Sequence, residues 1–277
     1  MDKTLKSETV LFFTIPTTVL IIVASLGGLM FGSTYSRETA SWYAQAIAQD
    51  IANLVIIVPT LLVSAFFVTR GKKSALFVWL GAMLYTAYTF VIYSFGVHFN
   101  SLFLVYCWAL GLSLYSLIVT TAKLSSGEVK SWFDETRREY LVSSFVLIAG
   151  VLFYLMWLKE DLPAMIVHHT PMSLQENGLM TNPVHVLDFS LVLPGFIITS
   201  ILLLRQHPIG YFFTPILLVF AALMDMTIAW LVVFMNLRGT TGDIALTAVF
   251  VIVAAICLMV LVIFLRHMKK PNVSTVS

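Results

Sequence analysis

Ionisable and amide side chains occur at a few positions inside otherwise apolar stretches of this chain. Asp50 and Asn53 are three residues apart, and His185 and Asp188 repeat that spacing. Residues three apart share one face of a helix. Asp225 stands alone in the middle of a long apolar run. Because charged groups inside a membrane are costly, they usually face a protein interior, a cavity or a partner. These five residues are therefore the candidate binding residues for a solute or an ion.

Asp225 has no obvious counter-charge, because no Lys or Arg lies deep in any apolar run. Desolvation disfavours a carboxylate without a partner, so we predict that Asp225 responds to a proton or a cation. A structural hydrogen bond is the alternative. The candidate partners carry hydroxyl groups: Tyr85, Thr86, Tyr88, Thr89 and Thr227.

Composition determines the class of element that positions these residues. The chain has 277 residues, of which 59% are hydrophobic and 11% charged, so a soluble domain is excluded. A helix needs about 20 apolar residues to cross the bilayer. The runs are continuously apolar, whereas a membrane barrel alternates. We predict an all-α polytopic membrane protein, a single transmembrane domain over 1–277, with eight transmembrane helices near 9–32, 45–69, 74–97, 102–122, 141–158, 184–204, 211–237 and 244–266.

The basic residues predict the orientation of these spans. All but three of the 16 Lys and Arg residues lie in every second gap, and the exceptions are Arg37, Lys159 and Arg238. Because basic loops stay in the cytoplasm, the N- and C-termini are predicted to be cytoplasmic. The first apolar run is too long for an ordinary signal peptide, so we predict that it is retained. Short loops favour a bacterial inner membrane, and the charge pattern gives no reason to expect nucleic-acid binding.

A weak internal similarity relates two parts of the chain. A shift of 135 residues places Asp50–Arg70 on His185–Arg205 and Pro59 on Pro194. It suggests two parallel four-helix repeats, with halves at 1–122 and 141–266 joined by a cytoplasmic loop at 123–140. Few positions are identical, so chance similarity is the alternative. If the repeat is real, the two polar pairs face each other in an outward-facing vestibule, and the prolines act as helix hinges.

Three function classes are compatible with this pattern, and enzyme activity is left open. The first is a transporter or channel-like protein for a small solute or ion, without a cofactor. The second is a membrane-embedded, metal-dependent hydrolase with zinc at its outer face, although no spacing places two histidines one turn apart. The third is a sensor or structural subunit of a complex. The spacing of Gly28 and Gly32 suggests a face for a homo-oligomer. The possible zinc ligands are His168, His169, His185 and Asp188.

Overall fold

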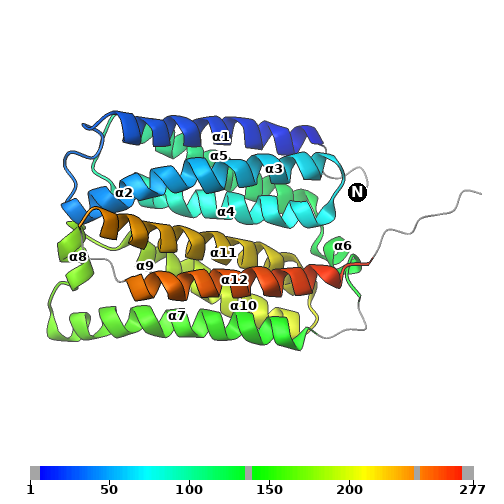
Figure 1. The fold of residues 1–277 in the computed structure, drawn as a ribbon. Helices are drawn as coiled ribbons and strands as arrows, with labels where there is room; N and C mark the ends of the chain where they lie inside the picture. The colour runs from blue at the N-terminus through cyan, green and yellow to red at the C-terminus, as the bar shows by residue number, and fades with distance from the viewer. Residues whose placement is uncertain (1–6, 135–138, 240–243, 270–277) are drawn as a thin grey trace, which may run out of the picture.

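The structure is a computed structural model that describes residues 7–134, 139–239 and 244–269. These residues fold into long helices that run side by side, as Figure 1 shows. Eight spans within them are long and apolar enough to cross a membrane. The predicted all-α polytopic fold with eight transmembrane helices is therefore confirmed.

Six of the eight spans found in the described residues are unbroken helices: α1 (Ser7–Met30), α4 (Lys73–Gly96), α5 (Phe103–Lys123), α7 (Tyr140–Val167), α11 (Pro208–Leu237) and α12 (Ile244–Arg266). Two spans consist of shorter helices in series. The second contains α2 (Ala40–Ala52) and α3 (Val58–Thr69), and the sixth contains α9 (Pro183–Leu187) and α10 (Leu193–Leu204). Short connecting helices are α6 (Ser126–Ser131) and α8 (Met172–Asn177).

The two ends of the bundle are distinguished by these connecting helices. The start of α1 and the end of α12 lie at the end that carries α6, and we call it the α6 end (Figure 1). The opposite end carries α8, and we call it the α8 end. Aromatic side chains close the α6 end, where Phe133 is buried against the rings of Phe77, Tyr211 and Phe264. This aromatic packing fills the interior of the bundle where α4, α11 and α12 meet at the α6 end.

Each broken span contains a π-helical turn directly before a proline. The turns are η1 (Asn53–Ile57) and η2 (Asp188–Val192), and Pro59 and Pro194 are each the second residue of the helix that follows. Proline lacks an N–H and clashes with the carbonyl four residues earlier, and a wider turn relieves that clash. The shift of 135 residues carries η1 onto η2 and α3 onto α10. The four-helix repeat nevertheless stays a prediction.

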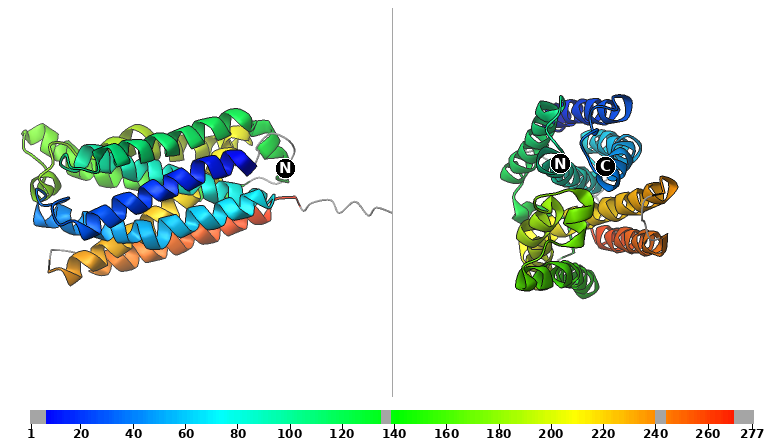
Figure 2. Two further views of the ribbon diagram at one scale, coloured as in Figure 1. Left: turned by 90° about the horizontal axis from the view of Figure 1, so that it is seen from above. Right: turned by 90° about the vertical axis from the view of Figure 1, so that its left-hand side faces the viewer.

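Helices α4 and α11 form the centre of the bundle and are its most buried spans. They lie side by side between α1–α3 and α12 in Figure 1. The end-on view in Figure 2 shows the blue helices α1–α3 above α11, and the red α12 and green α7 below it. The two helices pack closely at Gly81, where a Cβ atom would lie 2.5 Å from Cβ of Val219 and 2.9 Å from the carbonyl oxygen of Ile216. A small residue is therefore required at this crossing.

Gly81→Ala is expected to lower the free energy of unfolding by about 1–3 kcal/mol, the usual cost of overpacking a close contact. The matched control is Gly111→Ala in α5, because nothing lies within 4 Å of a Cβ atom there. Thermal unfolding of the purified proteins in detergent compares the two. Equal melting temperatures for both variants would contradict the close α4–α11 crossing.

Candidate functional site

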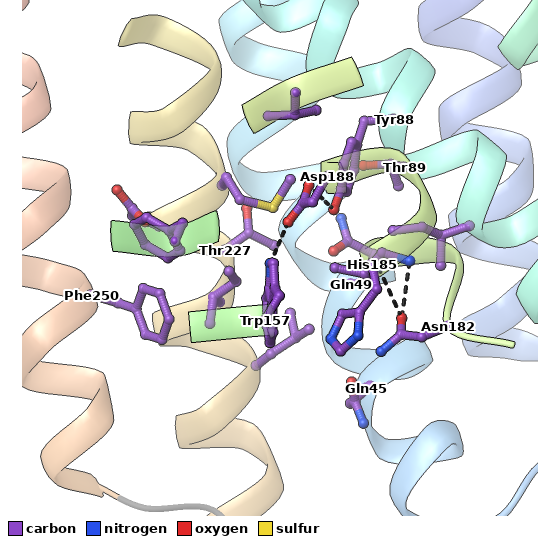
Figure 3. Close-up of a pocket in the computed structure, with 18 of the residues that line it drawn as sticks. Gln45, Gln49, Tyr88, Thr89, Trp157, Asn182, His185, Asp188, Thr227 and Phe250 are labelled. Atoms are coloured by element: carbon purple, nitrogen blue, oxygen red, sulfur yellow. Dashed lines mark hydrogen bonds between the residues drawn. The ribbon is translucent and has the colours of Figure 1, made fainter. Parts of the chain in front are cut away.

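A cavity of about 400 Å³ lies among α2, α4, α7 and the helices from α9 to α12. Ser173 and Asn177 of α8 contribute to its lining, which places its mouth at the α8 end. Apolar side chains form most of the wall, and the close-up in Figure 3 shows the polar ones. The other polar residues of the lining include Gln45, Gln49, Tyr88, Thr89, Tyr93, Trp157, Glu160, Asn182, His185, Asp188, Asp225 and Thr227.

Asp188 is held at the cavity wall by two neutral donors. The hydroxyl of Tyr88 donates to Oδ1 at 3.0 Å, and Nε1–H of Trp157 donates to Oδ2 at 2.7 Å (Figure 3). These bonds come from α4 and α7, so three different spans meet at this carboxyl. Neither donor neutralises a negative charge, so Asp188 contributes an acidic group to the cavity.

His185 lies one turn before Asp188 and is buried. Its Nδ1 is 2.9 Å from Oδ2 of Asp161, and its ring packs on that of Trp157 with 4.3 Å between centroids. The amide of Asn182 caps this short helix by accepting from the backbone N–H groups of Val184 and His185. The capping and the Asp161 contact fix the imidazole at the mouth of the cavity.

Asp225 lines the cavity near the middle of α11, and only 4% of the residue is exposed. The thiol of Cys257 in α12 donates to Oδ2 at 3.8 Å, the one hydrogen bond that its side chain makes within the described residues. Four of the five hydroxyls expected to bind Asp225 donate to other acceptors. Tyr88 donates to Asp188 and Tyr85 to Gln49, and Thr86 and Thr227 donate to backbone carbonyls of their own helices. Most of the hydrogen-bonding capacity of this carboxyl therefore remains available to a ligand.

Asp50 and Asn53 lie next to the cavity and do not belong to its described lining. The hydroxyls of Tyr35 and Tyr93 donate to the two carboxyl oxygens of Asp50, each at 2.8 Å, and Asp50 is fully buried. Asn53 donates to Ser25 at 3.3 Å. This group of residues is a hydrogen-bonded network between α1, α2 and α4.

Gln49 lines the cavity and connects it to this network. Its amide donates to Oδ1 of Asn53 at 2.9 Å and to the hydroxyl of Tyr85 at 3.0 Å. The five predicted residues thus separate into three that line the cavity and two that support its wall.

The proposed zinc ligands are not gathered at one point. His168 and His169 are exposed at the end of α7 and do not line the cavity that holds His185 and Asp188. Within the described residues, no group of three His, Cys, Asp or Glu side chains is arranged to hold a metal ion. Zinc remains an untested alternative.

Several residues of the site were not predicted from the sequence. Trp157 and Asp161 were placed at or beyond the end of the fifth span, whereas α7 continues to Val167. Their spacing of four residues on one helical face was the available signal. Cys257 is a third residue of the site without a predicted role, and it contacts Asp225.

Tyr35 lies in the connection between α1 and α2, where burial and the nearby Asp50 raise the pKa of its phenol above the usual 10.0. The folded state therefore retains a proton that the unfolded chain loses, and stability should fall as pH rises above 10. We expect the melting temperature of the wild type to drop more between pH 9 and pH 11 than that of Tyr35→Phe. An equal drop in both proteins would show that Tyr35 does not contribute.

Comparison with protein-family models, curated proteins and solved structures found no match to this chain. Its class follows from the fold, because the eight apolar helices in the described ranges define a multi-pass membrane protein in contact with the lipid bilayer.

Proposed function

We propose that this protein is a transporter or channel-like protein that moves a small solute or ion through the cavity around Asp225. The observation that carries the proposal is a buried carboxyl on the most central pair of helices. It faces a cavity and has one weak hydrogen-bond partner among the residues that the structure describes. A buried acidic group without a counter-charge costs stability. A cation or a proton bound beside it offsets that cost, so ligand binding accounts for its position.

We also propose the orientation and location predicted from the charges. In the described residues, the α8 end carries Arg37, Lys159 and Arg238, and the other Lys and Arg residues lie at or near the α6 end. The positive-inside rule then places the α6 end in the cytoplasm and the cavity mouth on the outer side. A bacterial inner membrane is the proposed location.

The π-turns supply the flexibility that transport needs. Both broken spans contribute to the cavity or to the network beside it, through Gln49 and Asn53 in one and Asp188 in the other. A π-turn followed by proline is a place where a helix bends. Bending at Pro59 and Pro194 would move the wall of the cavity relative to α4 and α11.

The proposal is tested by recording charge movement in proteoliposomes on a solid-supported membrane. A panel of small inorganic and organic cations is applied to the wild type, with protein-free liposomes as the background. We expect saturable, protein-dependent currents for at least one solute. If folded protein gives no current above background with any of them, the proposed function is contradicted, and a sensor or structural role is favoured.

A further inference from the structure

Helices α7 and α12 flank the cavity on one side of the bundle. These two helices have little direct contact with each other, unlike α1 and α5 in the N-terminal half, which pack directly together. Both line the cavity, α7 through Ala149 and Phe153 and α12 through Phe250 and Val253. Only side chains therefore separate the cavity from the hydrocarbon of the bilayer along this side.

The ionisable groups in the cavity lining are acidic or are held by acidic partners. Glu160, Asp188 and Asp225 are carboxyls, and His185 is paired with Asp161. The lining formed by the described residues contains no Lys or Arg. An anionic ligand would meet repulsion here, whereas a cation would find a counter-charge.

Aromatic rings make up a large part of the same wall. Trp42, Tyr88, Trp157 and Phe250 all line the cavity, and the last three are labelled around it in Figure 3. Aromatic faces attract cations, most strongly where water is excluded. The cavity thus combines apolar walls, aromatic rings and a buried carboxyl. This combination fits a lipophilic ligand that carries one positive charge.

We propose that the cavity binds a lipophilic organic monocation, which enters from the bilayer between α7 and α12 and places its charge beside Asp225. This inference rests on the proposed function, in which transport occurs through this cavity, and it adds the class of substrate. A hydrophilic ion would enter from the mouth at the α8 end and would not need the lateral route.

Equilibrium binding of radiolabelled tetraphenylphosphonium to the protein in lipid nanodiscs tests the inference, with empty nanodiscs as the background. Tetraphenylborate has the same shape and the opposite charge, so it is the charge control. We expect saturable binding of the cation and none of the anion. Asp225→Asn should weaken cation binding at least tenfold, on the order of one charge-assisted contact.

The lateral route is tested with a matched pair of variants in α12. Val253→Trp fills the cavity wall, whereas Val251→Trp places the same bulk on the exposed, lipid-facing side of the helix. We expect Val253→Trp to weaken or slow tetraphenylphosphonium binding and Val251→Trp to leave it unchanged. Because neither variant alters Asp225, this comparison remains informative if Asp225→Asn does not fold.

Equal binding of the cation and the anion, or cation binding that neither Asp225→Asn nor Val253→Trp reduces, would overturn the inference. Its failure is distinguishable from failure of the proposed function. If an inorganic cation drives currents but tetraphenylphosphonium does not bind, the proposed transport function is supported and the lipophilic ligand is rejected. If tetraphenylphosphonium binds in an Asp225-dependent way but no transport is found, the ligand class is supported and the transport function is rejected.

Discussion

Gly28→Leu is expected to lower the free energy of unfolding by roughly 3 kcal/mol or more, through overpacking and unmade hydrogen bonds at a buried carboxyl. A Cβ atom at Gly28 would lie 2.0 Å from Oδ2 of Asp50 and 2.6 Å from the hydroxyl of Tyr35. The substitution therefore displaces the carboxyl from its two phenol donors. Thermal unfolding of the purified protein in detergent measures the loss.

Gly32→Leu is the matched control, because nothing lies within 4 Å of a Cβ atom at that position. It should leave the melting temperature of the monomer unchanged. The pair also tests the predicted oligomer face, since Gly28 is covered by the chain's own side chains. If Gly32→Leu changes the oligomeric state in size-exclusion chromatography, Gly32 contributes to a contact between copies. A Gly28→Leu protein as stable as the wild type would show that the Asp50 network does not support the fold.

Asp225→Asn is expected to leave the bundle folded. The apparent affinity for the transported solute, measured from the currents, should fall roughly 10- to 100-fold, which corresponds to the loss of a charge-assisted contact of about 1.5–3 kcal/mol. The fold should tolerate the change because, in the described part of the chain, the carboxyl receives one hydrogen bond, from Cys257. An amide has the same shape but supplies no charge to a bound cation. The currents are recorded over a range of solute concentrations in proteoliposomes.

Glu8→Gln is the control, since it makes the same chemical change at an exposed position in the first turn of α1. Its currents should match those of the wild type. If Asp225→Asn also has wild-type currents, Asp225 is not part of the transport route. If it unfolds instead, the carboxyl supports the fold, and the test of ligand binding passes to the comparison of Val253→Trp with Val251→Trp.

The membrane spans were predictable because the hydropathy of a segment depends only on its own residues. A long apolar run favours the bilayer whichever helices pack beside it. The prolines at 59 and 194 likewise indicated irregular positions in their spans, and the structure has a π-turn directly before each one. Hinge motion at these prolines stays a prediction. The extent of α7 was not predictable, because Lys159, Glu160 and Asp161 interrupt the apolar run while its helix continues to Val167. That extension brings Asp161 to His185.

The partners of the buried polar residues depend on how each helix is rotated against its neighbours. Asp188 is bonded by Tyr88, 100 residues away, and Asp225 by Cys257 on the next span. Helical periodicity in nearly uniform apolar runs does not reveal these rotations. The sequence therefore identified Asp50, His185, Asp188 and Asp225 as residues requiring partners, and the structure identifies which side chains those partners are.

The most direct test of the account is whether the cavity is reached from both faces of the membrane. Thr227 lines it, and Thr227→Cys places a small thiol reporter in the cavity. The background is Cys107→Ala with Cys257→Ser, because serine keeps a hydrogen-bond donor for Asp225. A membrane-impermeant maleimide is applied to right-side-out and inside-out vesicles. The account predicts labelling from both faces, because a moving wall opens the same cavity to each side in turn. Labelling from one face alone, or from neither, would contradict it.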